Sequence, residues 1–156
     1  SGIGQVNAVR LPSGADVSAD VRFSERNGEF VCNIGSLSVG EALLHNIGLK
    51  LRPSDEKIDY FISAEDESGK YACDGSYIYN MERSATGAAP FWELHGAFDA
   101  VNIGTVYRFA EALYPPAHIP QPAALESVRC TTEFYISSDL HNFSYNCVRL
   151  VLIKLI

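Results

Sequence analysis

The sequence predicts an α+β fold, in which one main helix packs on a mainly antiparallel β-sheet. Short segments that alternate apolar and polar residues, separated by turns rich in Gly, Pro, Asn and Asp, recur along the chain and are typical of antiparallel strands. Residues 38–48 instead repeat apolar side chains every four positions, as a helix does. A single domain over residues 1–156 accommodates both patterns.

Residues 1–27 predict an N-terminal β-hairpin extension. The segments VNAVRL and VSADVRF flank a PSGAD turn, and apolar residues occupy every other position from Val17 to Phe23. The residues ERNG then indicate a second turn before a short strand over residues 29–34. The start of the chain therefore supplies three strands.

Residues 38–48 have the features of a helix with both ends marked. Ser38 and Glu41 form a capping box, in which each side chain satisfies a backbone N–H, and Gly48 occupies the position of a left-handed C-cap. The apolar face consists of Val39, Leu43 and Ile47. We expect this helix to cover the sheet.

The remaining chain predicts further strands and the end of a second helix. The strands are expected over residues 57–63, 71–81, 91–98, 127–137 and 143–156. The segment VNIGTVYRFAEALY predicts helix near its end, stopped by PPAHIPQP. The last strand is apolar on both sides, which predicts a central position in the sheet.

Charge and hydropathy exclude several functional classes. The net charge is −7 and no run of Lys or Arg reaches three residues, so we expect no strong nucleic-acid binding. No apolar stretch has the roughly 20 residues that a membrane helix needs. The four histidines and four cysteines lack the close spacing of metal ligands. We therefore predict a protein without membrane segment, metal or cofactor.

The four cysteines, Cys32, Cys73, Cys130 and Cys147, predict two disulfides rather than four buried thiols. Disulfides indicate an oxidising compartment, so we expect a secreted, extracellular protein. Four cysteines allow three connectivities, and the spacing leaves the pairing open. Asn142 begins the sequon Asn-Phe-Ser and is a glycosylation candidate.

One set of residues has the chemistry of an RNA-cleaving site. Such a site needs a general base, a general acid and a cation, and Glu133, Arg129 and His141 supply these types; Arg149 and His95 are the alternatives. The predicted turn between Glu133 and His141 separates them. Solvated positions on an exposed sheet face are the competing interpretation, and we favour it.

Two other groups of polar residues have weaker functional signals. Glu93 and His95 lie two positions apart, so a strand would place both on one side. An acidic cluster, Asp55, Glu56, Glu65, Asp66 and Glu67, lacks the regular pattern of a calcium loop and predicts a solvated rim. The aromatic residues are expected in the core and in cross-strand pairs.

The triplet Phe30-Val31-Cys32, followed by the predicted helix and by Cys147 near the C-terminus, resembles the ribonuclease-like secreted effectors of plant-pathogenic fungi. The resemblance implies a Cys32–Cys147 disulfide that ties the first strand to the last, and leaves Cys73–Cys130 as the second pair. It also implies a ribonuclease-like fold without catalytic residues.

The leading functional hypothesis is a secreted, non-catalytic effector that binds a host protein or immune receptor. We expect a monomer, and delivery into host cells is left open. Two alternatives remain: a secreted ribonuclease or other small hydrolase, and a bacterial periplasmic inhibitor or immunity protein.

Overall fold

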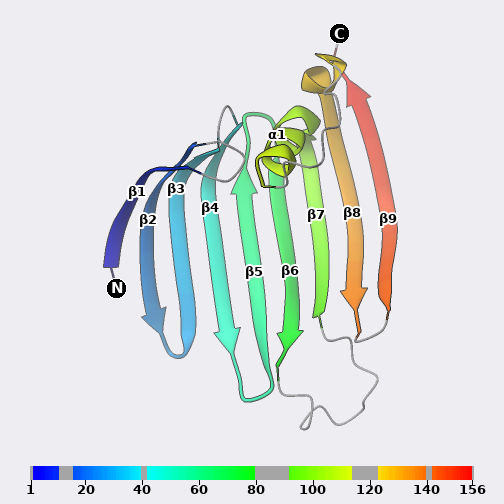
Figure 1. Ribbon diagram of the computed structural model, residues 1–156. Helices are drawn as coiled ribbons and strands as arrows, with labels where there is room; N and C mark the ends of the chain where they lie inside the picture. Colours follow the sequence, from blue (N-terminus) through cyan, green and yellow to red (C-terminus); the bar gives the residue numbers. More distant parts are fainter. Residues whose placement is uncertain are drawn as a thin grey trace.

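A computed structural model describes residues 2–10, 16–39, 42–79, 92–113, 123–139 and 142–155. Nine strands form one sheet, in which every strand pairs antiparallel with the next one along the chain (Figure 1). In the described part of the chain, one short α-helix and one 3₁₀ helix interrupt this succession. The protein is an antiparallel meander, and the predicted α+β class is wrong.

The strands contain nine to twelve residues each, well above the usual five or six. They are β1 (Gly2–Arg10), β2 (Asp16–Arg26), β3 (Glu29–Val39), β4 (Ala42–Pro53), β5 (Lys57–Glu65), β6 (Lys70–Ile78), β7 (Trp92–Asn102), β8 (Val128–Ser138) and β9 (Phe143–Lys154). The helices are α1 (Ile103–Leu113) and the 3₁₀ helix η1 (Ala123–Ser127), both between β7 and β8. The helical end predicted for the VNIGTVYRFAEALY segment is therefore present as α1.

The main helix predicted over residues 38–48 is wrong, because residues 38–39 form the end of β3 and residues 42–48 the start of β4; residues 40 and 41 lie outside the described part of the chain. The Ser38 hydroxyl shares a hydrogen bond of 2.6 Å with Ser18 on β2 instead of capping a helix. Val39 lies opposite Ala42, and both are buried. The apolar residues of the segment thus contribute to the sheet itself.

The β2–β3 turn confirms the predicted ERNG turn. Asn27 and Gly28 both have positive φ, 54° and 76°, as the two central residues of a type I′ hairpin require. The Gly28 amide also donates to the Glu25 carboxylate at 3.0 Å. This turn sets the register of the first long hairpin.

The two faces of the sheet differ in chemistry. On the face that carries α1, aromatic rings cover glycines of the neighbouring strand, as Tyr60 covers Gly75 and Phe134 covers Gly96. A Cβ at these two glycines would lie 2.5 Å from Tyr60 Oη and 2.2 Å from the Phe134 ring. The rings therefore lie flat against the sheet, and glycine is required beneath them. The opposite face is polar.

A buried carboxylate anchors the region where α1 begins. Asp66 follows β5, is 7% exposed, and accepts five hydrogen bonds. The donors are the Ser68 amide and hydroxyl, the Gly69 amide, the Tyr71 hydroxyl and the Asn102 amide. We refer to these residues as the Asp66 clasp. Asp66 itself was predicted as part of a solvated acidic rim, and its burial contradicts that prediction.

The clasp joins the β5–β6 turn to the end of β7. There the Asn102 side chain accepts a hydrogen bond of 2.8 Å from the Gly104 amide and so caps α1. A bulge precedes it, where Ala100 has φ 52° and the β7–β8 register shifts. A Cβ at Gly69 would lie 2.2 Å from the Asp99 carbonyl oxygen, so the two segments touch backbone to backbone.

The last strand was predicted to be central, and this prediction is wrong: β9 pairs only with β8 at one edge of the sheet. All twelve residues of β9 are exposed. Its apolar residues on both sides therefore have no covering layer. The apolar pattern alone could not distinguish a covered strand from an uncovered edge.

The predicted disulfides are absent, since all four cysteines are free thiols. Cys32 and Cys147 lie on β3 and β9, which are six strands apart, and Cys73 and Cys130 lie on β6 and β8, with β7 between them. Neighbouring strands are about 4.8 Å apart, so even the second pair exceeds the roughly 7 Å limit on Cα separation for a disulfide. The Cys32–Cys147 staple implied by the resemblance is wrong for this fold.

The described helices also bear on membrane insertion. Neither α1 nor any other helix among the described residues is long and apolar enough to cross a membrane.

Candidate functional site on the polar sheet face

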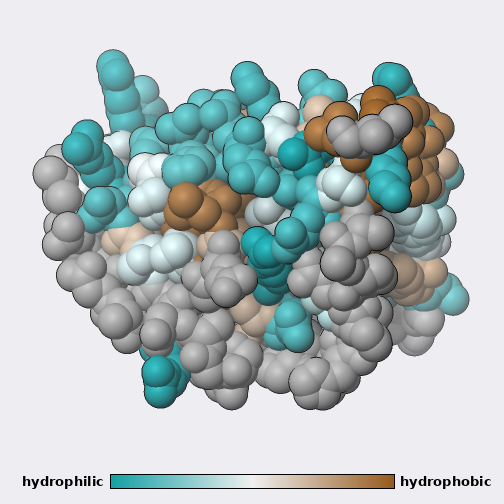
Figure 2. All heavy atoms as spheres, turned by 90° about the horizontal axis from the view of Figure 1, so that it is seen from above, coloured by the Kyte–Doolittle hydropathy of each residue, from teal (hydrophilic) through white to brown (hydrophobic). Residues whose placement is uncertain are grey.

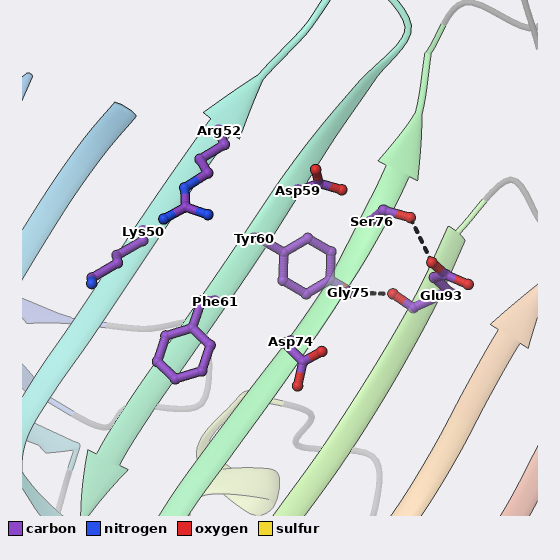
Figure 3. A pocket seen from close by; sticks show the side chains of 9 residues that line it. All are labelled: Lys50, Arg52, Asp59, Tyr60, Phe61, Asp74, Gly75, Ser76 and Glu93. Carbon is purple, nitrogen blue, oxygen red and sulfur yellow. Dashed lines mark hydrogen bonds between the residues drawn. The ribbon is translucent and has the colours of Figure 1, made fainter. Parts of the chain in front are cut away.

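The polar face of the sheet, opposite α1, carries a row of side chains that crosses five strands. Figure 3 shows the first three of them, Lys50, Phe61 and Asp74. Residues directly opposite one another on paired strands share a face. The row runs Lys50, Phe61, Asp74, His95, Tyr135, from β4 to β8. We call it the His95 row.

His95 lies at the centre of this row between two carboxylates. Its Nδ1 is 3.0 Å from Asp74 Oδ1 and its Nε2 is 3.1 Å from Glu133 Oε1. The ring also stacks on Tyr135, with 4.5 Å between centroids and 17° between planes. Three neighbouring strands therefore hold the imidazole in one orientation.

The carboxylates change the protonation of His95. Burial of the ring lowers its pKa, but the hydrogen bonds and charges of Asp74 and Glu133 raise it more, so the His95 pKa lies above its ordinary value of 6.5. With the ring protonated, both nitrogens donate to carboxylate oxygens. The side chain of His95 remains 28% exposed and that of Asp74 57%, so solvent reaches both.

A second row adjoins the first and encloses a shallow hollow of about 540 Å³ with it (Figure 3). This second row runs Arg52, Asp59, Ser76, Glu93. The Ser76 hydroxyl donates to Glu93 at 2.9 Å. Below, from the apolar face, Tyr60 reaches past Gly75 and donates to the Glu93 carbonyl at 2.5 Å. Polar side chains therefore border the hollow and an aromatic ring supports its floor.

Charge is unevenly distributed over this face. Four carboxylates, Asp59, Asp74, Glu93 and Glu133, lie on β5 to β8. Cations lie toward β4, where Arg52 forms an ion pair with Glu29, and the Glu29 pKa is lowered, first by the Arg52 hydrogen bond. The centre of the face is acidic and one side of it is basic.

The structure separates the residues predicted for RNA cleavage. Glu133 contacts His95, and Arg149 lies opposite it on β9. Arg129 lies four residues from Glu133 on β8, so the two residues are about 13 Å apart along the strand. Its guanidinium donates to the Glu126 carbonyl at 3.2 Å. His141 lies outside the described residues. The alternatives His95 and Arg149, rather than His141 and Arg129, thus accompany Glu133.

Other predicted positions are found where their patterns indicate. Glu93 and His95 share the polar face, as the two-residue spacing predicts. Asn142 is exposed in the β8–β9 turn, where its amide donates to Asp139 at 2.5 Å. Its glycosylation stays a prediction.

Asp74 was not identified from the sequence, although it contacts His95 directly. The two residues are 21 positions apart, and only the β6–β7 register joins them. The available signal was the alternation in YACDGSYI, which predicts a polar side for Asp74 and Ser76 but not their neighbours. Among the described residues, no group of three His, Cys, Asp or Glu side chains is arranged to hold a metal ion.

No protein-family model, curated protein or solved structure matches the chain. The resemblance to ribonuclease-like effectors therefore stays a prediction, and two of the features that suggested it, the helix and the cysteine tie, are absent.

Proposed function

We propose that the protein is a non-catalytic binding protein whose polar face recognises a partner protein through basic side chains on the partner. The observation that carries the proposal is the His95 row, with the carboxylates around it and the exposed aromatic rings Phe61 and Tyr135 at 42% and 46% exposure. These groups are presented across an open sheet rather than inside a cleft. Such a surface suits a macromolecular partner.

The state of His95 favours binding over acid–base catalysis. A general base needs a free lone pair, but Asp74 and Glu133 occupy both ring nitrogens and favour the protonated form. Proton transfer would first require one of these hydrogen bonds to break. The imidazolium instead holds the two carboxylates in fixed positions, with the free oxygen of each accessible to a ligand.

The chemistry of the face favours arginine on the partner. A guanidinium binds carboxylates with paired hydrogen bonds and stacks on aromatic rings, and Asp74 lies between Phe61 and His95 in the row. The net charge of −7 also accelerates the approach of a basic partner. A basic host protein or receptor fits the effector hypothesis, and a basic enzyme fits the inhibitor or immunity hypothesis.

A nitrogen-15 NMR titration with an arginine–glycine repeat peptide tests this proposal. We expect amide shifts concentrated in β5 to β8, and none with a glutamate–glycine peptide. The double variant Asp74→Asn with Glu93→Gln should weaken binding about tenfold, through loss of two charge-assisted contacts. The control, Asp55→Asn with Glu56→Gln, removes two exposed carboxylates from the β4–β5 turn and should change affinity less than twofold. Equal weakening by both variants would show unspecific charge attraction and contradict the proposal.

A second candidate function, phosphodiester cleavage, is favoured by one observation. Glu133 lies 3.1 Å from His95 Nε2 and opposite Arg149, which brings together a carboxylate, an imidazole and a cation. RNA cleavage that Glu133→Gln abolishes while peptide binding persists would support catalysis. Absence of cleavage across substrates would remove this candidate.

A further inference from the structure

The edge strand β9 exposes more large apolar side chains than any other strand among the described residues. Figure 2 shows hydrophobic surface gathered at the end of the sheet where β8 and β9 lie. Eight large apolar residues of β9 and the position after it are between 37% and 67% exposed. They are Phe143, Tyr145, Val148, Leu150, Val151, Leu152, Ile153 and Leu155.

This edge lacks most of the features by which proteins protect an open strand. Protected edges are short, carry several charges or prolines, or are covered. β9 has twelve residues, no proline, and only Arg149 and Lys154 as charged side chains. One bulge residue, Val148, interrupts its pairing with β8. The unpaired backbone groups of β9 are therefore open to another strand.

The bulge gives β9 a symmetric arrangement of apolar residues. Before it, Tyr145 and Cys147 lie on the apolar face, opposite Ile136 and Phe134. After it, Leu150 and Leu152 lie on that same face, opposite Thr132 and Cys130. Odd-numbered residues in the first half thus share a face with even-numbered residues in the second half.

We infer that β9 pairs antiparallel with β9 of a second copy of this chain, across a two-fold axis perpendicular to the sheet. Such an axis keeps each face continuous, so an apolar-face residue must oppose an apolar-face residue. The parity described above satisfies this condition over the whole strand when Tyr145 lies opposite Leu152 of the second copy. Cys147 then lies opposite Leu150 of the second copy.

The charges of β9 agree with this register. Lys154 lies opposite Phe143 of the second copy, and Arg149 lies opposite Val148 of the second copy. No cation therefore faces a cation directly. Arg149 also has Glu133 beside it on β8, which offsets the like charge of the two copies near the axis.

The exposed apolar area of β9 approaches that of a homodimer interface. Full burial of one large apolar side chain removes roughly 60–120 Å² from water, and the eight side chains are already about half buried, so they offer on the order of 250 to 500 Å². A standard interface buries about 800 Å² on each partner, and about 65% of it is apolar in homodimers, or roughly 500 Å². Pairing of two identical edges also closes the assembly, whereas pairing with a different edge would extend it without limit.

The dimer goes beyond the proposed function, because it uses an edge rather than the polar face. It differs from the monomer predicted from the sequence. It would double the number of polar faces and present them on the same side of one continuous sheet.

Light scattering coupled to size-exclusion chromatography of charge-reversed variants tests the inference. Wild type should elute at twice the 17.1 kDa of one chain. Tyr145→Lys with Leu152→Lys opposes two pairs of like charges and should give a monomer, and so should Tyr145→Glu with Leu152→Glu. An equimolar mixture of the two variants should restore a dimer, because every opposed pair is then of opposite charge. Unfolded variants could not give that result.

The control is Phe30→Lys with Leu43→Lys, which adds the same charge at residues of 50% and 43% exposure on β3 and β4 and should leave the dimer intact. A monomeric wild type at about 100 µM would overturn the inference, because a dimer with a Kd on the order of 1 µM would be mostly associated at that concentration. So would a dimer that survives the β9 lysines, or a mixture that stays monomeric. None of these results affects peptide binding at the polar face, which is measured separately.

Discussion

Asp66 and Asp74 belong to the same sheet and both centre a cluster of hydrogen bonds, yet their surroundings give them different roles. Asp66 is 7% exposed, and its five donors come from the β5–β6 turn, β6 and the end of β7. The Asp74 side chain is 57% exposed and forms a hydrogen bond with His95. A saturated, buried carboxylate holds segments together, whereas an exposed one with free acceptor capacity remains available to a ligand.

The pKa of Asp66 reflects its surroundings. Burial raises the Asp66 pKa, but the hydrogen bonds from Tyr71, Asn102 and Ser68 lower it more, so it lies below the ordinary value of 3.8. Burial and Asp66 in turn raise the pKa of Tyr71 strongly. The two groups stay ionised and neutral, respectively, over the ordinary pH range.

The largest expected difference between Asp66 and Asp74 is the loss of unfolding free energy when each carboxylate is removed. Asp66→Ala leaves five buried or partly buried donors without their acceptor and should lower the free energy of unfolding by about 3 kcal/mol or more. Asp74→Ala should change it by less than about 0.5 kcal/mol, because its ion pair is exposed. Urea denaturation of both variants measures the contrast. Similar losses would mean that Asp74 is as structural as Asp66.

Removal of one donor sharpens the comparison. Tyr71→Phe takes away only the hydroxyl that donates to Asp66 at 2.6 Å and should cost about 1.5 kcal/mol, as expected for a buried hydrogen bond to a charged group. Tyr135→Phe, which keeps the ring on His95, is the matched control and should be nearly neutral. Urea denaturation again provides the readout, and a neutral Tyr71→Phe would show that the clasp is not a strong restraint.

The two clusters should also respond to opposite ends of the pH range. The Asp66 pKa is lowered, so its stabilisation is complete above the unfolded pKa and is lost as pH falls below about 4. The His95 pKa is raised, so its smaller stabilisation is complete below pH 6.5 and is lost as pH rises through the folded value. Denaturation midpoints should lose the acid dependence in Asp66→Asn and the alkaline dependence in His95→Gln. Unchanged profiles would contradict these assignments.

The smallest expected effect concerns the pKa of His95. Glu133→Gln removes one of the two charges that raise the His95 pKa, so this pKa should fall toward 6.5 while stability changes by less than about 0.5 kcal/mol. The pH dependence of the imidazole proton shifts in NMR spectra gives the value directly. A pKa that does not move would show that the contact with Glu133 at 3.1 Å is not maintained in solution.

The strands could be predicted where the local sequence pattern favours the same structure as the pairing between strands. Alternation indicates β5 to β8 to within a few residues, and Asn27-Gly28 marks a turn whose geometry the sequence specifies. The helix predicted over residues 38–48 is wrong because its signals were local. Gly40 within it costs about 1 kcal/mol of helix stability, whereas Ser38 and Val39 pair with β2, and His45 and Gly48 pair with β5.

The candidate site could be predicted only in part. The spacing of Glu93 and His95 indicates a shared side, but Asp74 and Glu133 reach His95 from 21 and 38 residues away. Those contacts depend on the register of two strand pairs, which no local pattern sets. The prediction that β9 is central is wrong for a related reason: an apolar strand has the same sequence pattern whether another strand of the chain or a second molecule covers it.

The order of the strands has a consequence for the kinetics of folding. Every strand pairs with its neighbour along the chain, so most of the sheet can form from local hairpins, and only the β6–β7 and β7–β8 pairs close longer connections. Pairing can start at the tight β2–β3 hairpin and add strands one at a time. β9 follows β8 during synthesis, so the strand with the most exposed apolar side chains emerges when β8, the strand it pairs with, is already present.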